Sequence, residues 1–262
     1  MLFAARRLAH SGAQGVLIDR RNFHTFTPLL YQVAAAELEP DEIAYPVRTI
    51  FRGQKNVRMV LGEVQRVDVL ARTLQVGQLV LDFEDLILAT GSTTSFFGVQ
   101  GAPEHTLPLK TPGDAVRLRS HILGCFERAA NTRLRGRPRA GGRHRRVDRR
   151  RARRPSAPLP MLAPVAIQAG EAAAENILRT AAGRPARSFR YRDKGTMATI
   201  GRNAAVAILG GRGFSGFVAW VLWLAIHISS LIGLRNRLLV LTNWAWDYLF
   251  FERGVRLIDP NP

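Results

Sequence analysis

Hydrophobic and polar positions follow two different periods along the chain, which together predict an α/β fold. Residues 3–10 have the spacing of a helix, and a glycine-containing turn then leads to a short apolar run that ends at Asp19. Such a run, bounded by turn residues, predicts a buried strand. Four short alternating runs follow, separated by glycines or by Ala71-Arg72, and predict an antiparallel meander. These runs are residues 57–61, 63–67, 73–76 and 79–83.

The pattern beyond the meander predicts one more strand and two helices. Residues 86–92 read LILATGS, a buried strand ending in small residues, where the backbone can lie against a flat ligand or simply turn at the glycine. Thr111, Pro112 and Asp114 are typical of a helix start, and this helix should reach about residue 130 with Cys125 as a small apolar residue. A second helix is expected to follow the stretch 159–170 and to end near residue 180.

The C-terminal part holds two apolar stretches that predict contact with a membrane. Residues 214–234 include no Asp, Glu, Lys or Arg, and as one helix they would be about 30 Å long, which matches a hydrocarbon core. Residues 238–251 are too few to span but contain five aromatic residues. A monotopic hairpin and a single transmembrane helix are both consistent with this pattern, and a soluble core helix is the third alternative. Residues 210–213 are interpreted as a flexible lead-in to this region.

Composition excludes several classes of protein. The 262 residues are 47% hydrophobic, which is enough for a real core and rules out global disorder. One cysteine rules out an internal disulfide, a CxxC pair and a cysteine-based metal site, and no metal is expected. The N-terminal residues lack a sustained apolar run and a cleavage site, so no signal peptide is predicted.

The net charge of +18 is concentrated in one short window. Residues 131–154 carry 12 arginines and one aspartate, which is +11 of the total. Three explanations compete for this window: an arginine-rich arm that binds phosphates, a solvated linker, or the product of a reading-frame error in a GC-rich gene. The arm has no interleaved aromatic residues, which argues against specific binding of single-stranded nucleic acid.

Two polar residues are candidates for chemistry. An acidic residue at the end of an apolar strand, such as Asp19, is where dinucleotide-binding folds hold a ribose hydroxyl, although most such residues only meet solvent. A G-x-G-x-x-G loop should precede that strand, and the sequence does not contain one there. Gln168 stands on a small, apolar helix face, where its amide needs a partner, and a structural hydrogen bond is the simplest one.

In their order along the chain, these pieces resemble the type II (non-proton-pumping) NADH dehydrogenases, flavoproteins of the pyridine nucleotide-disulfide oxidoreductase superfamily. The resemblance covers about residues 2–130 and 159–258. The PLLYQVA and APVAIQ stretches are the specific ones, whereas ATG is common to many flavoproteins. The stretches that carry it are 17–34, 56–64, 86–91, 107–111, 163–170 and 214–258.

The resemblance implies a Rossmann-like FAD-binding fold, FAD as cofactor, NADH as co-substrate and electron transfer to membrane quinone. Asp19 would hold the adenosine ribose, and Arg20, Arg21 and His24 would lie near the adenine, pyrophosphate or flavin. The backbone of Ala89, Thr90 and Gly91 would pack along the cofactor. Ala166 and Ile167 would sit at the isoalloxazine edge, with Gln168 in the quinone pocket as the catalytic residue.

The same resemblance divides the chain into four parts. Residues 1–130 would be a partial FAD-binding domain, and residues 131–158 stand where the family carries its NADH-binding domain. Residues 159–205 would complete the FAD and quinone region, and residues 206–258 would be membrane-anchoring helices. The fold class expected is therefore α/β, with an incomplete FAD-binding Rossmann-like domain, an antiparallel β-meander and a C-terminal helical membrane segment.

The expected function is FAD-dependent NADH:quinone oxidoreduction, impaired in this chain because one phosphate loop and the nicotinamide site are missing. The soluble part would face the cytoplasm from the inner (plasma) membrane, with lipid, quinone and NADH as partners and a homodimer through the tail left open. One alternative is a membrane-attached protein whose arginine-rich arm binds nucleic acid or anionic lipid. The other is an inactive structural remnant.

Overall fold

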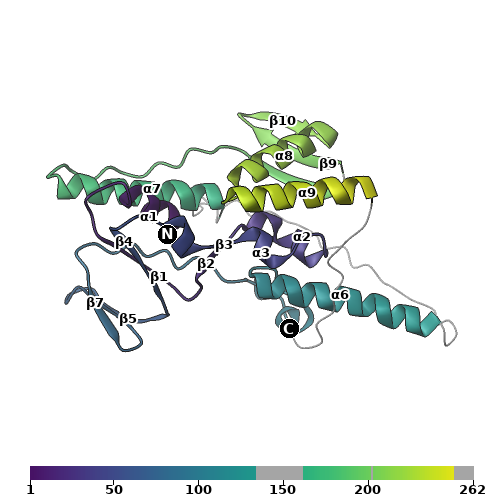
Figure 1. The fold of residues 1–262 in the computed structure, drawn as a ribbon, viewed down its shortest axis with the longest axis horizontal. Coiled ribbons are helices and arrows are strands. Elements are labelled where there is room, and N and C mark those ends of the chain that lie inside the picture. Colours follow the sequence, from purple (N-terminus) through teal and green to yellow (C-terminus); the bar gives the residue numbers. More distant parts are fainter. Residues whose placement is uncertain (134–161, 202, 251–262) are drawn as a thin grey trace.

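The structure is a computed structural model, and it describes residues 1–133, 162–201 and 203–250 (Figure 1). Most of the arginine-rich window and the end of the tail lie outside these residues. Helices occur at α1 (Leu2–Leu8), α2 (Leu30–Ala34), α3 (Pro40–Ile43), α4 (Val47–Ile50), α5 (Ala102–His105), α6 (Pro112–Arg133), α7 (Ala163–Ala181), α8 (Gly216–Ser230) and α9 (Leu234–Phe250), with a 3-10 turn at Thr27–Leu29. Strands occur at β1 (Gly15–Asp19), β2 (Phe23–Thr25), β3 (Ala44–Pro46), β4 (Val57–Leu61), β5 (Val64–Asp68), β6 (Thr73–Val76), β7 (Leu79–Asp82), β8 (Thr196–Gly201), β9 (Ala204–Leu209) and β10 (Arg212–Ser215).

The parallel part of the fold is the pair β1 and β4, covered by α1. Gly15 pairs with Val57 and Asp19 with Leu61, so the two strands end at the same edge. Leu17 and Met59 point into a small core with Leu2, Val47 and Phe51. Helix α7 packs on α1 through small residues. At Gly170 the two helices are so close that an added Cβ would lie 3.5 Å from the backbone nitrogen of Ala4. The predicted strand ending at Asp19 is confirmed, as is the helix predicted to end near residue 180, although α7 begins at Ala163, inside the stretch expected to precede it.

The antiparallel meander is confirmed, but it has three strands instead of four. Strands β5, β6 and β7 pair in order, with Asp68 opposite Thr73 and Val76 opposite Leu79. The first run of the predicted meander, 57–61, is β4 and pairs parallel with β1. An alternating run fixes only which residues share a face, whereas its partner depends on strands distant in the chain.

The strand expected at residues 86–92 is wrong. This segment is extended but belongs to no ladder, and Leu88 through Gly91 are exposed. A strand requires a neighbour that takes its backbone hydrogen bonds, and the parallel sheet of the described residues contains only β1 and β4. Apolar composition alone therefore did not make this segment a strand.

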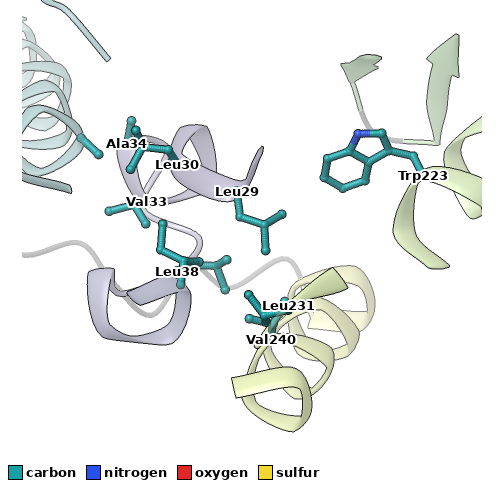
Figure 2. Packing of buried hydrophobic residues seen from close by; sticks show 10 residues of the cluster. Leu29, Leu30, Val33, Ala34, Leu38, Trp223, Leu231 and Val240 are labelled. Carbon is teal, nitrogen blue, oxygen red and sulfur yellow. The ribbon is translucent and has the colours of Figure 1, made fainter. Parts of the chain in front are cut away.

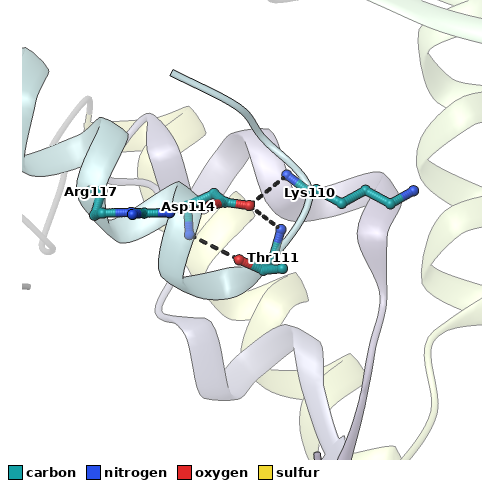
Figure 3. A network of polar contacts seen from close by, with 4 residues as sticks. All are labelled: Lys110, Thr111, Asp114 and Arg117. Atoms are coloured by element: carbon teal, nitrogen blue, oxygen red, sulfur yellow. Dashed lines mark hydrogen bonds and ion pairs between the residues drawn. The ribbon is translucent and has the colours of Figure 1, made fainter. Parts of the chain in front are cut away.

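Helix α6 begins as predicted, with reciprocal capping at its first turn (Figure 3). The Asp114 amide donates to Thr111 Oγ1 at 3.1 Å, and the Thr111 amide donates to Asp114 Oδ2 at 2.8 Å. The Lys110 amide and the Arg117 guanidinium also donate to this carboxylate. Burial opposes ionisation of Asp114, but the hydrogen bonds from Thr111, Arg117 and Lys110 outweigh it and lower the pKa of the carboxyl. Cys125 lies exposed on the same helix.

A three-stranded antiparallel sheet, which the sequence analysis did not predict, precedes the C-terminal helices. Strand β9 lies in the centre, between β8 and β10. Gly210 and Gly211 form the tight turn between β9 and β10, with φ angles of 55° and 79° that favour glycine. Residues 210–213 are therefore a hairpin turn and the start of a strand, and the interpretation of this cluster as a flexible lead-in was wrong.

The single helix expected over residues 214–234 is also wrong. Phe214 and Ser215 belong to β10, where they pair with Ala207 and Val206. Helix α8 ends at Ser230, and its 15 residues correspond to about 22 Å at 1.5 Å per residue, less than the roughly 30 Å of a hydrocarbon core. Among the described residues, no helix has the length and apolar character needed to cross a membrane.

The main hydrophobic core joins the C-terminal helices to the N-terminal part (Figure 2). Leu29, Val33 and Leu38 from the α2 region meet Leu231 and Val240 around α9, with Trp223 from α8 at one side. Leu29, Val33, Leu38 and Val240 have no exposed surface. This core holds α8 and α9 above α2 and α3 (Figure 1).

Candidate functional site

The carboxyl end of β1 gathers the first group of predicted site residues. Asp19 is half-buried, and its Oδ1 accepts a hydrogen bond from the Arg21 amide at 2.9 Å. Among the described residues, its Oδ2 has no hydrogen-bond partner. The Gly62 amide donates to the Asp19 carbonyl and fixes the end of the strand beside β4. The Asp19 side chain is thus positioned by local backbone contacts while one oxygen stays available to a ligand.

The two arginines that follow Asp19 lie at the surface. Arg20 makes an ion pair of 3.4 Å with Glu63, and both side chains are largely exposed, so this pair adds little stability. The Arg21 guanidinium lies 5.9 Å from the centre of the Phe23 ring. Either guanidinium can approach a phosphate without a large change in the fold.

His24, a predicted site residue on β2, has a perturbed pKa. Burial, followed by the charges of the N-terminal ammonium and the Arg21 guanidinium, lowers the pKa of His24 below its usual value, against the opposing effect of Asp19. The neutral imidazole therefore predominates at neutral pH. His24 and Arg21 both follow Asp19 within five residues, at the end of β1 and the start of β2.

The second group lies on α7, where Gln168 has two backbone partners. Its Nε2 donates to the Arg192 carbonyl at 2.9 Å, and its Oε1 accepts from the Arg192 amide at 3.0 Å. This is the structural hydrogen bond that the sequence analysis considered for the residue. Ala166 and Ile167 directly precede Gln168 in α7, and the Ala166 amide donates to the Leu162 carbonyl.

Among the described residues, no contact joins residues 89–91 to either group of predicted site residues. They lie in the exposed segment between β7 and α5. The role of Ala89, Thr90 and Gly91 at a cofactor therefore stays a prediction.

Several polar residues at the packing interfaces were not singled out from the sequence. Asn176 binds the backbone of Arg187 in the same two-bond manner as Gln168 binds Arg192. Glu42 accepts from Asn243, and Asn236 donates to the carbonyl of Glu42, so α3 and α9 share a polar contact. The sequence could have indicated the contact of Asn176, because Gln168 and Asn176 are eight residues apart and therefore share one face of the helix. The second depends on residues about 200 positions apart and gives no local signal.

Comparison with known proteins finds family matches in two regions of the chain. Residues 2–131 match the pyridine nucleotide-disulphide oxidoreductases, and residues 194–253 match the NDH2 C-terminal domain. The type II NADH:quinone oxidoreductase Ndh of Mycobacterium tuberculosis is 26% identical over an alignment that covers 97% of this chain and 87% of that relative. The chain belongs to the type II NADH dehydrogenases. Its resemblance to that family is confirmed on both matched regions.

Two further relatives define how much of a type II NADH dehydrogenase the chain matches. NdhA of Mycobacterium tuberculosis is 40% identical over 132 residues, which are 49% of this chain and 28% of that relative. The structure of NDH2 from Plasmodium falciparum in complex with NADH superposes with a TM-score of 0.76 at 12% identity, covering 95% of this chain and 96% of that chain. This superposition shows the fold, which is mixed α/β and Rossmann-like.

FAD is the cofactor of the family, and one end of its site fits the residues present. The Asp19 carboxylate, with one oxygen available at the carboxyl end of a parallel strand, fits a ribose that donates two hydroxyl hydrogen bonds. The basic groups of Arg20 and Arg21 fit a nearby phosphate. On α7, the amide of Gln168 is already bonded, so a ligand there would meet the exposed methyl of Ala166 and the half-buried side chain of Ile167.

Proposed function

We propose that this chain carries the FAD-binding and quinone-facing parts of an FAD-dependent NADH:quinone oxidoreductase without the domain that binds NADH. NADH:quinone oxidoreduction is the activity that its family supports. The observation that carries the proposal is that the two matched regions are separated only by residues 132–193. Within this stretch the resemblance resumes at residue 159, which leaves the short interval 131–158.

The length of that interval supports the absence of an NADH domain. A dinucleotide-binding domain needs on the order of 100 residues, whereas 28 residues lie between Ala130 and Leu159. The alignment with Ndh extends over 402 positions, 140 more than the chain has residues. A large part of that relative therefore has no counterpart here.

The residues present would bind and orient the cofactor from one side. When bound, FAD would accept a hydride and pass on single electrons, while the protein would supply position and exclude water. Asp19 would hold the adenosine ribose, Arg20 and Arg21 would neutralise phosphate charge, and neutral His24 would donate or accept one hydrogen bond beside them. Ala89, Thr90 and Gly91 would contribute backbone, and Ala166, Ile167 and Gln168 would face the flavin and quinone end.

The test is the absorbance spectrum of the detergent-purified chain between about 350 and 500 nm, before and after addition of NADH and then of dithionite. We expect weak or no flavin absorbance, and any flavin present should bleach with dithionite but not with NADH. Bleaching by NADH would contradict the proposal. No flavin, even after incubation with FAD, would favour the inactive remnant.

A matched pair of variants locates any flavin that binds. Asp19→Ala removes the carboxylate proposed to hold the ribose and should weaken FAD binding by about tenfold, because a hydrogen bond to a charged group is lost. Asp82→Ala removes an exposed carboxylate from β7 and should leave binding unchanged. Equal affinities of the two variants would exclude Asp19 from the site.

We further propose that α8 and α9 lie in the membrane interface, with the soluble part on the cytoplasmic side. Both helices expose large apolar side chains, and their aromatic residues prefer the interfacial region. The exposed residues are Phe217, Val218, Val221 and Ile226 on α8, and Leu238, Leu241, Trp246, Tyr248, Leu249 and Phe250 on α9. This is the interfacial hairpin that the sequence analysis weighed against a spanning helix, and a homodimer through these helices would compete with lipid for the same surface.

A further inference from the structure

An open groove of about 940 Å³ lies along α1 and α7, and Gln168 is the one residue proposed for the flavin and quinone end that lines it. One wall is the outer face of α1, which includes Phe3, Arg6 and His10. The floor is α7, and the other wall is the extended segment 187–192, which runs back along α7 toward β8 (Figure 1). The volume is in the range of small-molecule sites.

Two side-chain amides fix the segment over the helix and create the groove. Gln168 holds the backbone of Arg192, and Asn176 holds the backbone of Arg187, each with two hydrogen bonds of 2.8–3.0 Å. The amides are eight residues apart on a helix, roughly 12 Å. The five residue steps between their partners can extend to about 16 Å, so the segment bows outward and leaves space above Glu171 and Glu175.

The groove has an excess of positive charge. Its lining includes five arginines and two glutamates, which together carry a net charge of +3. Glu175 pairs with Arg7 at 2.8 Å. Arg6, Arg187, Arg190 and Arg192 have no carboxylate within 4.0 Å in the part of the chain that the structure describes. Four guanidinium groups therefore face one groove without the acidic partners that would neutralise them.

We propose that this groove binds a phosphate-bearing ligand with two or more negative charges. Guanidinium groups match phosphate oxygens with two parallel hydrogen bonds, and several of them around one groove favour a multiply charged anion over a single carboxylate. Phe3 and Phe189 add apolar surface for the part of the ligand next to the phosphate. The same chemistry is present in a soluble diphosphate and in the headgroup of an anionic phospholipid.

The test follows modification of individual arginines by phenylglyoxal in the full chain, with mass spectrometry as the readout. A site-resolved readout is needed because the arginines of residues 131–158 also attract anions. Inorganic pyrophosphate and vesicles of phosphatidylcholine with phosphatidic acid are the two probes. We expect one or both to slow the modification of Arg187 and Arg190, while exposed Arg52 reacts at its usual rate.

Two variants, each with a matched control, distinguish binding in the groove from attraction of anions to the positive charge of the whole chain. Asn176→Ala keeps every arginine but releases the anchor of Arg187, and it should weaken protection several-fold. Asn22→Ala removes an exposed amide that does not line the groove and should leave protection unchanged. Arg187→Gln should weaken protection of Arg190 by about tenfold, and Arg52→Gln should leave it unchanged. Circular dichroism verifies that each variant keeps its helices.

The outcomes separate the ligand sources. Protection by pyrophosphate indicates a soluble phosphate ligand, and protection only by vesicles that contain phosphatidic acid indicates a lipid headgroup. The absence of protection by either probe would overturn the proposal, as would equal protection of Arg52. Because none of these measurements involves flavin or NADH, their failure is distinct from failure of the proposed oxidoreductase function.

Discussion

Glu42 is the residue at which the N-terminal part and the last helix meet most closely. It is buried, one carboxylate oxygen accepts from the Glu39 amide, and the other accepts from Asn243 on α9. Asn236 adds a hydrogen bond of 2.8 Å to the Glu42 carbonyl. Burial raises the pKa of Glu42, and the hydrogen bonds from Glu39 and Asn243 only partly oppose this.

The raised pKa predicts that Glu42 destabilises the fold as pH rises. Because the protonated form is favoured in the folded state, the contribution of Glu42 is fully present below the unfolded pKa, about 4.3, and is lost as pH rises through the higher folded value. The parent should therefore lose stability relative to Glu42→Gln as pH rises above the unfolded pKa of about 4.3. Urea denaturation at a series of pH values measures this difference, and a constant difference would contradict it. Glu84→Gln, at an exposed site, is the control.

Thr111 is a second residue with a defined energetic role. Its hydroxyl accepts the Asp114 amide at the start of α6, and Thr111→Ala leaves that amide without its partner. The expected loss is about 1 kcal/mol in the free energy of unfolding. Thr111→Ser keeps the oxygen and should retain nearly all of the stability. If chemical denaturation gave the same value for both variants, the cap would have no role.

At the scale of elements, the short connection between α8 and α9 sets the position of the tail. Gly233 has a φ of 88° and lies against the ring of Tyr45, where a Cβ would overlap the aromatic carbons. This glycine lets α9 start three residues after Leu231, which is buried in the main core. The turn therefore determines how both helices pack against the α2 region.

Gly233→Ala should disrupt this turn. The new Cβ meets Tyr45, and alanine is disfavoured at positive φ, so we expect a loss of at least about 2 kcal/mol in stability. Gly12→Ala is the matched control, since a Cβ there meets nothing within 4 Å. Thermal unfolding followed by circular dichroism compares the two. Equal melting temperatures would mean that the turn adapts freely.

At the scale of the whole molecule, exposed apolar surface is concentrated on the C-terminal helices. Phe217 on α8 is 57% exposed and Leu249 on α9 is 68% exposed. The core beneath them, with Trp223 and Val240, keeps the two helices attached to the N-terminal part (Figure 2). In the proposed interfacial binding, these exposed side chains of α8 and α9 would contact the membrane.

Removing that surface should weaken membrane binding of the whole chain. The double variant Phe217→Ser/Leu249→Ser loses two side chains that would enter the interface and should bind phosphatidylcholine vesicles at least about tenfold more weakly. Leu70→Ser, at a residue that is 98% exposed on the β5–β6 turn, is the control and should bind as the parent does. Vesicle flotation measures both. Equal flotation of the double variant and the control would contradict interfacial binding.

The sequence by itself determined the features whose causes are local. The start of α6 follows from Thr111 and Asp114, the end of β1 from the apolar run before Asp19, and helix α7 from its own periodicity, because capping and side-chain alternation involve residues a few positions apart. Family membership was also evident from local stretches that match over about 230 residues.

Only the tertiary structure decided which segments find partners. Residues 86–92 have strand composition but no neighbouring strand, and the apolar run 214–234 is divided because Phe214 and Ser215 pair with β9. Gln168 was a candidate for the quinone pocket, and its observed partner is a backbone 24 residues away. Hydrogen bonds of this kind join groups distant in sequence, so their partners are chosen by the packed fold and leave no periodic signal in the chain.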